Sequence, residues 1–166
     1  MTSRSQDDTR SLRILGTGRL PSPENGPDVR LLEFFPNCYP ARPYVISIVF
    51  PEFTSLCPVT GQPDTGIISL EYIPEDLCVE SKSFKLYMFA FRNHRSFMET
   101  ITNTILDDLR VAIDPCWCRV KGLFASRGGT RIHVFAEGFK SLPPERDGQL
   151  RDAVRAWKAE PDPHRP

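Results

Sequence analysis

Four separate segments of the chain have the patterns of strands, three with alternating apolar and polar residues and one with a continuous β-branched and aromatic run. The segments are residues 44–50, 67–73, 116–125 and 131–138. The first of them is a β-branched and aromatic run that Pro51 is expected to end, because proline cannot donate to a strand ladder. We therefore predict four strands, and we consider an additional strand near residues 29–35.

Between the second and third predicted strands, the hydrophobic period lengthens from two residues to about 3.6, as in an amphipathic helix. Ser81 is placed to cap a helix whose apolar face holds Phe84, Tyr87, Met88 and Phe91. A second helix is predicted at about residues 96–112, with Pro115 beyond its end. The order β-β-α-α-β-β predicts an α+β fold, a four-stranded antiparallel sheet with both helices on one face.

Both ends of the chain differ in composition from this central unit. Residues 1–27 are rich in Ser, Asp, Pro and Gly, which predicts a flexible N-terminal segment before a folded domain at 28–142. Residues 143–166 are polar and rich in proline. Within this tail, residues 149–158 could form a short helix with Leu150, Val154 and Trp157 on one face, and such a helix should dock on the domain.

Composition limits the class of protein. A chain of 166 residues suits one domain, and 21 basic against 21 acidic residues leave no net field that would attract nucleic acid or an acidic membrane. Five cysteines are an odd number in a chain too large to need disulfides, so reduced thiols are expected. The polar start resembles no secretory signal, and no apolar stretch approaches a membrane span, so we expect a cytoplasmic protein.

The connection at residues 53–66 is the first candidate for a functional segment. It appears as a 14-residue loop with two prolines and two glycines, and loops of that length are often functional. It carries Cys57 and Asp64, a thiol and an acid that together suit covalent catalysis on a C=N or C=O electrophile. The alternative interpretation is a small buried cysteine and an aspartate that caps a turn.

The predicted helices carry further candidates. Lys82, Lys85 and Arg92 share a helical face and could seat a phosphate, although such a basic stripe is more often only a solvated surface. Glu99 could accept hydrogen bonds from the N–H edge of a guanine-like base, or it could simply favour the helix dipole. The cysteine spacing does not suit a metal site, and no Gly-x-Gly-x-x-Gly motif indicates a Rossmann cofactor site.

Three motifs together resemble a known family. The stretches SLCPVTGQPD at 55–64, CVESKSFKLY at 78–87 and FRNH at 91–94 are similar to the NADPH-dependent 7-cyano-7-deazaguanine reductases of queuosine biosynthesis. The similarity runs from about Cys38 to Phe139 and indicates the short, single-domain branch. It implies the tunnelling fold (T-fold) for residues 28–142, and reduction of a nitrile to an aminomethyl group through a covalent thioimide.

The resemblance also implies roles for individual residues. Cys57 would be the catalytic nucleophile and Asp64 the proton donor, while Lys82 and Lys85 would bind NADPH. The implied substrate-binding residues are Val79, Glu80, Ser81, Met98 and Glu99. Met98 stands where members of the family often have histidine, and a thioether cannot shuttle a proton.

The resemblance further implies a deazapurine as small-molecule substrate, a homo-oligomer with active sites at subunit interfaces, and no direct contact with nucleic acid or membrane. Two alternatives remain open at this point. One is a zinc-dependent, cyclohydrolase-like pterin or purine enzyme on the same fold, and the other is a non-catalytic purine-binding subunit.

Overall fold

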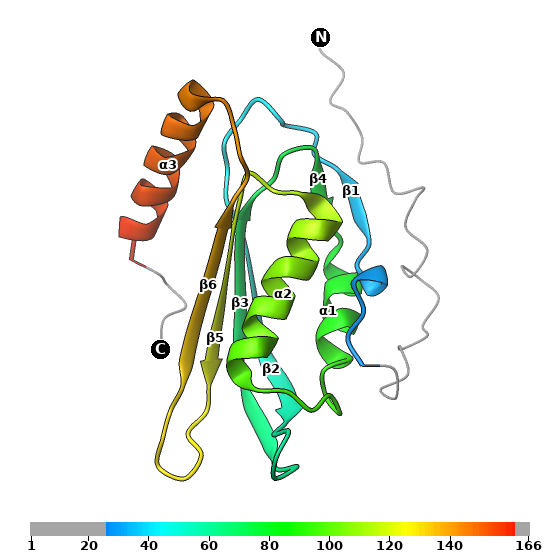
Figure 1. Ribbon diagram of the computed structural model, residues 1–166. Coiled ribbons are helices and arrows are strands. Elements are labelled where there is room, and N and C mark those ends of the chain that lie inside the picture. The colour runs from blue at the N-terminus through cyan, green and yellow to red at the C-terminus, as the bar shows by residue number, and fades with distance from the viewer. Residues whose placement is uncertain (1–25, 162–166) are drawn as a thin grey trace.

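Four strands form one antiparallel sheet in the order β2-β3-β5-β6 (Figure 1). The computed structural model describes residues 26–161, so nearly all of the predicted N-terminal segment, 1–27, lies outside the described residues. The strands are β2 (Ile46–Leu56), β3 (Pro63–Ile73), β5 (Trp117–Phe124) and β6 (His133–Phe139). Sequence neighbours therefore lie side by side, as hairpin connections favour.

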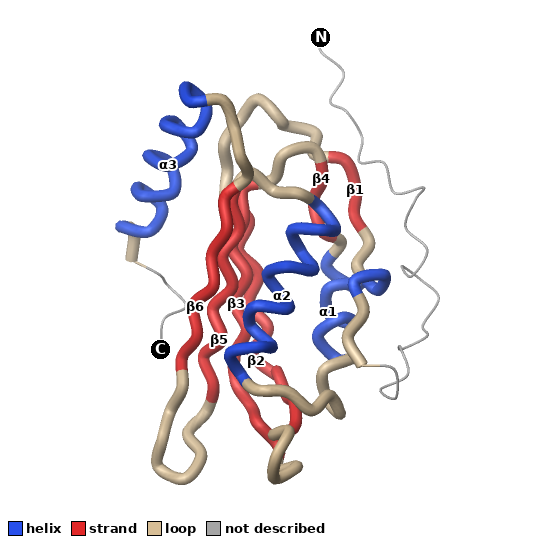
Figure 2. Tube along the Cα trace, in the orientation of Figure 1, coloured by secondary structure: helices blue, strands red, loops and turns tan. Residues whose placement is uncertain are grey.

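Helices α1 (Ser81–Phe89) and α2 (Met98–Ile113) both cover the same face of the sheet (Figure 2). The main core lies between these layers, where Ile105 and Leu109 of α2 and Leu70 and Val120 of the sheet are fully buried. Helix α2 ends at Asp114, which adopts a left-handed conformation with φ of 38°, and Pro115 prevents continuation. The predicted α+β fold, with two helices on one face of a four-stranded antiparallel sheet, is confirmed.

The predicted 14-residue loop at 53–66 is wrong, because most of it is strand. β2 continues through Pro51 to Leu56, and only residues 57–62 connect it to β3. Proline is tolerated because β2 is an edge strand and its pairing shifts register between Phe50 and Phe53, so that Pro51 falls in a β-bulge. The result is a long hairpin with Cys57 at the first position of its turn.

Two short strands, β1 (Phe34–Pro36) and β4 (Leu77–Val79), pair beside α1. The additional strand considered near 29–35 is therefore mostly a 3₁₀ turn, η2 (Val29–Leu31), with β1 following it. The cap predicted at Ser81 is also wrong by one residue. Glu80 is the N-cap of α1, and its carboxylate accepts hydrogen bonds from the backbone N–H groups of Lys82 at 2.8 Å and Ser83 at 2.7 Å.

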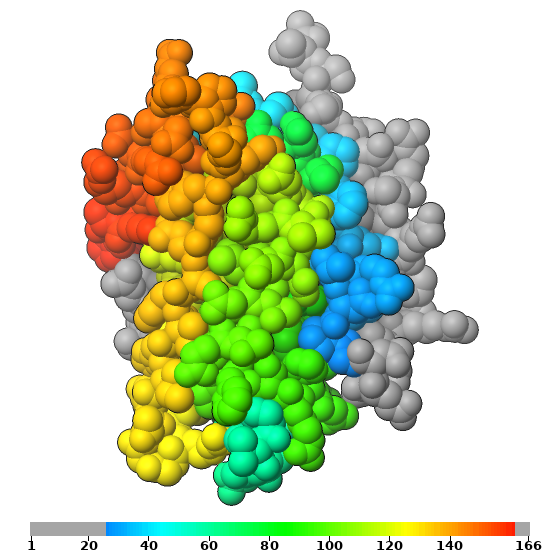
Figure 3. Space-filling view, viewed as in Figure 1, coloured from blue at the N-terminus to red at the C-terminus, as the bar shows by residue number. Residues whose placement is uncertain are grey.

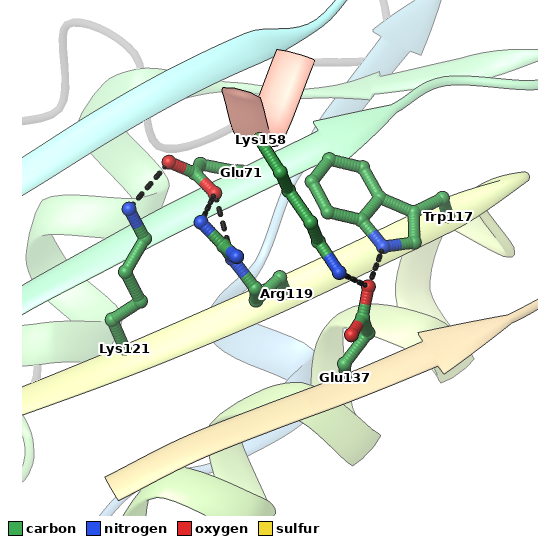
Figure 4. Close-up of polar contacts among 6 residues, drawn as sticks. All are labelled: Glu71, Trp117, Arg119, Lys121, Glu137 and Lys158. Atoms are coloured by element: carbon green, nitrogen blue, oxygen red, sulfur yellow. Dashed lines mark hydrogen bonds and ion pairs between the residues drawn. The ribbon is translucent and has the colours of Figure 1, made fainter. Parts of the chain in front are cut away.

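A third helix, α3 (Pro144–Ala159), packs on the opposite face of the sheet and includes the tail segment expected to be helical. Its Leu150 and Val154 form a second, smaller core with Ile73 and Trp117. Glu137 of β6 ties the helix down, because its carboxylate accepts from Trp117 Nε1 at 2.6 Å and pairs with Lys158 (Figure 4). Between residues 143 and 159, the tail is therefore part of the folded unit.

Beyond α3, this opposite face carries charged side chains together with exposed apolar ones, among them Val49 and Phe135. Glu71 at its centre pairs with Arg119 at 2.8 Å and with Lys121 at 2.6 Å (Figure 4). The Glu71 carboxylate is buried, and a buried charge is tolerated only when it is paired in this way. The two faces of the sheet thus differ, because one is apolar under α1 and α2 and the other has a buried ion-pair cluster at its centre.

Candidate active site

Three segments that are distant in sequence meet at one end of the sheet. The β2–β3 and β5–β6 turns lie at the same end, and the start of α2 is beside them (Figures 1 and 3). Leu56 joins them through its backbone, because its N–H donates to His94 O at 3.0 Å and its carbonyl accepts from Ser96 N at 3.1 Å. Cys57, Asp64 and the first turn of α2 are thereby brought into one region.

The loop that carries Cys57 is closed by its own backbone. Cys57 N donates to Gln62 O at 2.8 Å, and Gly61 N donates to Cys57 O at 2.9 Å. Gly61 has φ of +68°, a backbone conformation that residues other than glycine rarely adopt. These backbone contacts close the loop around Cys57, whose side chain is buried.

The environment of the Cys57 sulfur favours the thiolate. The pKa of Cys57 is lowered to about 6, first by a hydrogen bond from the Thr60 hydroxyl and then by the backbone N–H groups of Thr60 and Val59. Burial of the side chain opposes this shift, and Arg127 adds to it. A cluster of donors around the sulfur therefore outweighs its desolvation, so Cys57 is mostly ionised at neutral pH.

We expect the alkylation rate of Cys57 by iodoacetamide to rise as pH increases through about 6, because only the thiolate reacts. Thr60→Val should move the midpoint to higher pH, since it removes the largest stabilising hydrogen bond. Intact mass spectrometry against a Cys57→Ala background measures the rate. Cys116 and Cys118 should contribute little, since burial raises the pKa of each to about 12, and the Cys57→Ala background corrects for the other thiols. A midpoint of the rate–pH curve at about 8.5, the ordinary pKa of cysteine, would contradict this description of the loop.

Asp64 lies on β3 directly opposite Ser55 of β2. Ser55 precedes Cys57 by two residues in the chain. The Asp64 carboxylate is buried, and Oδ1 lies 2.7 Å from Arg127 Nη1. Arg127 comes from the β5–β6 turn and also contributes to the lowered pKa of Cys57. Sequence reasoning assigned no role to Arg127, because only the pairing of β3 with β5 brings that turn beside the β2–β3 hairpin.

A second group of predicted residues lies at the junction of β4 and α1. The Val79 N–H donates to Tyr72 Oη at 3.1 Å, and the Glu80 carboxylate caps α1 as described above. Ser81 and Lys85 are exposed, and Lys82 is half-buried. Each Glu80 oxygen already accepts one backbone N–H, so a ligand would find only the remaining lone pairs.

The two groups are not joined within one chain. Helix α1 has nine residues. It starts beside β4 and runs toward the end of the sheet that holds Cys57. The nine residues of α1 span about 13 Å and separate the residues at its start from the end of the sheet that holds Cys57. The three cavities described for residues 26–161, of about 560, 500 and 220 Å³, are lined by neither Cys57 nor Asp64.

The residues predicted at the start of α2 also differ from one another. Met98 is 7% exposed and packs in the main core, whereas Glu99 is exposed in the first turn. Phe97 precedes them as an N-cap without a side-chain hydrogen bond and is 57% exposed. Of these residues, only Glu99 presents a polar group at the surface next to the Cys57 hairpin.

Comparison with known proteins identifies the family. The chain is 75% identical over its whole length to a protein of Desulfovibrio desulfuricans named NADPH-dependent 7-cyano-7-deazaguanine reductase. A protein of the same name from Nitratidesulfovibrio vulgaris is 63% identical, with 99% of each chain covered. The chain belongs to this reductase family. The resemblance drawn from the three motifs is thereby confirmed.

The reductase family extends to more distant relatives. A Neisseria meningitidis protein of the same name is 46% identical over 81% of this chain and 85% of its own length. The family model described as QueF-like protein matches residues 63–141. A crystal structure titled as the apo form of the archaeosine synthase QueF-Like has a TM-score of 0.55 at 22% identity, covering 61% of this chain and 99% of that one, which supports the fold alone.

Membership in the reductase family sets aside the alternative of a zinc-dependent cyclohydrolase. Within residues 26–161, no three His, Cys, Asp or Glu side chains are grouped so that they could hold a metal ion. In the same part of the chain, no helix combines the length and the apolar character needed to cross a bilayer. All five cysteines are free thiols.

Proposed function

We propose that this protein reduces the cyano group of 7-cyano-7-deazaguanine to an aminomethyl group by covalent catalysis at Cys57, as a step of queuosine biosynthesis. The predicted class, an NADPH-dependent oxidoreductase, is confirmed by the family. The observation that carries the covalent mechanism is the pairing of a low-pKa thiol with a buried carboxylate across one rigid hairpin. Such a pair supplies the nucleophile and, when Asp64 is protonated, the proton that addition to a nitrile requires.

In the first step, the Cys57 thiolate adds to the nitrile carbon. The sulfur–carbon bond forms as one π bond of the C≡N group breaks, and protonated Asp64 transfers its proton to the nitrogen. The product is a neutral thioimide, with Asp64 left as the carboxylate. The site suits this step because the sulfur is ionised at neutral pH while Asp64 lies in a buried position, away from bulk water.

When bound, NADPH would supply the two hydrides that the reduction requires, one for the thioimide carbon and one for the imine carbon. Between the two hydride transfers, the carbon–sulfur bond breaks and the Cys57 thiolate leaves. The resulting imine stays in the site for the second reduction. Two hydrides and two protons together convert the nitrile to the primary amine. Lys82 and Lys85 are proposed to hold the cofactor phosphates through their ammonium groups, since the N–H groups at the start of α1 are already bonded to Glu80.

A complete site is proposed to form between copies of the chain, because α1 separates the Lys82 group from the Cys57 group in one subunit. Strands β2 and β6 are the two edges of the sheet, and exposed strand edges favour pairing with another chain. They run in opposite directions, so β6 of one copy can extend the antiparallel sheet of the next at β2. The deazaguanine is then proposed to lie between Cys57 and Glu99 of one copy and Val79, Glu80 and Ser81 of another, with Met98 supporting the pocket from the core.

Subunit mixing tests this shared site. Cys57→Ala and the double variant Lys82→Ala/Lys85→Ala should each be inactive alone. After the two are unfolded and refolded together, a fraction of activity should return, since some interfaces contain both intact halves. The control is each variant refolded with itself. Failure of the mixture to regain any activity, when native mass spectrometry shows mixed oligomers, would contradict a site shared between subunits.

The overall reaction is tested with purified protein, the nitrile and NADPH. The loss of reduced-nicotinamide absorbance should correspond to two NADPH molecules for each nitrile, and the product should gain four hydrogen atoms in mass. We further propose that residues 28–142 carry this reaction and that the enzyme works in the cytoplasm, where free thiols persist. A protein that bound the nitrile without oxidising NADPH would instead be the non-catalytic purine-binding subunit.

A further inference from the structure

Two buried polar atoms at the proposed site lack hydrogen-bond partners. They are Ser55 Oγ and Asp64 Oδ1, and both are inaccessible to solvent. Ser55 is 0% exposed and Asp64 is 4% exposed. Within residues 26–161 very few side-chain atoms are in this condition, and buried polar atoms without partners are rare in folded proteins because they lose their bonds to water.

These two atoms belong to residues that face each other. Ser55 and Asp64 are direct partners in the register of β2 and β3. Directly opposed residues have Cβ atoms about 4.5–5.5 Å apart and project to the same side of the sheet. A hydroxyl donor and a carboxylate acceptor therefore belong to directly paired residues without bonding to each other.

Arg127 explains why Asp64 is held away from Ser55. Its Nη1 lies 2.7 Å from Asp64 Oδ1, but the contact is an ion pair without the alignment of a hydrogen bond. The Arg127 side chain is 40% exposed and belongs to a turn that continues into Gly128 and Gly129, both with positive φ. A carboxylate paired with arginine cannot act as an acid, so this ion pair must open before Asp64 can deliver a proton.

We propose that Ser55 is a positioning residue for proton transfer by Asp64, an inference that rests on the proposed function. When Arg127 moves away, the Asp64 carboxylate takes up a proton from solvent on its other oxygen. The Ser55 hydroxyl then donates to Asp64 Oδ1 and turns the protonated oxygen toward the nitrile nitrogen. As that proton leaves, negative charge develops on the carboxyl group and the hydrogen bond from Ser55 strengthens. The hydroxyl thus stabilises the transition state more than the ground state.

The test compares the rates of two reactions at the same sulfur. Thioimide formation with the nitrile alone needs the proton from Asp64, whereas alkylation by iodoacetamide needs only the thiolate. Ser55→Ala should slow thioimide formation by about 10- to 100-fold, while KM and the alkylation rate change less than about twofold. Ser55→Thr, which keeps the hydroxyl, should restore most of the rate. Ser69→Ala removes another buried hydroxyl, on the opposite face of β3, and should leave both rates unchanged.

A double-mutant cycle separates positioning from a purely structural role. In an Asp64→Asn background, Ser55→Ala should cause no further loss, because the acid that it positions is already absent. Full thioimide formation by Ser55→Ala, an equal loss in alkylation, or additive losses in the double variant would each overturn the inference and leave the proposed function standing. If the wild-type protein forms no thioimide at all, the proposed function fails and this inference fails with it.

Discussion

Cys57→Ala is expected to lower kcat by at least about 10⁴-fold, because residues 57–62 of the hairpin tip hold no other thiol and hydride cannot readily reduce an unactivated nitrile. The fold should be unaffected, since Cys57 belongs to neither of the two hydrophobic cores. Intact mass after mixing with the nitrile alone gives a direct measurement. The wild-type chain should gain the mass of one substrate, and the variant should gain none.

Two further substitutions make this result specific. Cys57→Ser should be nearly as inactive, since a serine hydroxyl lacks the ionisation that Thr60 and the loop N–H groups support in the thiol. Cys38→Ala removes a thiol outside the hairpin and should retain activity and adduct formation. An active Cys57→Ala protein, or an adduct that maps to another cysteine, would rule out the covalent mechanism proposed here.

Asp64→Asn is expected to lower kcat by about 10² to 10⁴-fold, the usual contribution of a general acid. The amide has the same shape as the carboxyl group but cannot release a proton, so the nitrogen of the nitrile would remain unprotonated as sulfur adds. Thioimide formation should slow in parallel with kcat, whereas alkylation of Cys57 by iodoacetamide should continue. Stopped-flow mixing with mass detection follows both reactions.

Asp107→Asn, at an exposed position on α2, is the matched control and should behave as the wild type. The thermal midpoint of each variant shows whether the chain is still folded. If Asp64→Asn keeps more than about a tenth of the wild-type kcat, another group or water supplies the proton. His94, whose pKa is lowered by burial, would then be the next residue to replace.

The order of strands and helices could be predicted because the periodicity of the core positions is clear. Ile101, Ile105 and Leu109 of α2 recur at helical spacing and are all buried in the main core. The strand boundary at Pro51 could not be predicted in the same way. A proline usually ends a strand, and the bulge that accommodates it depends on pairing with β3, which no local pattern reports.

The candidate site was predictable where one segment carries its own chemistry. Cys57 and Asp64 stand in one motif, and the hairpin brings them to the same end of the sheet. The contributions of Thr60 and Arg127 to the Cys57 pKa depend on the folding of the loop and on the neighbouring turn, so sequence spacing gave no sign of them. In the sequence, Ser55 was only one residue of a motif. The missing hydrogen bond of its buried hydroxyl is seen only in the folded structure.

Helix α3 begins after the segment matched by the family model, which ends at residue 141. Nevertheless, its Leu150 and Val154 complete the apolar cluster around Trp117 and Ile73. The segment matched by the family model is therefore shorter than the part of the chain that packs as one folded unit. A recombinant fragment trimmed to the matched segment would expose an indole and its aliphatic neighbours to water, at the end of the sheet farthest from the reactive sulfur.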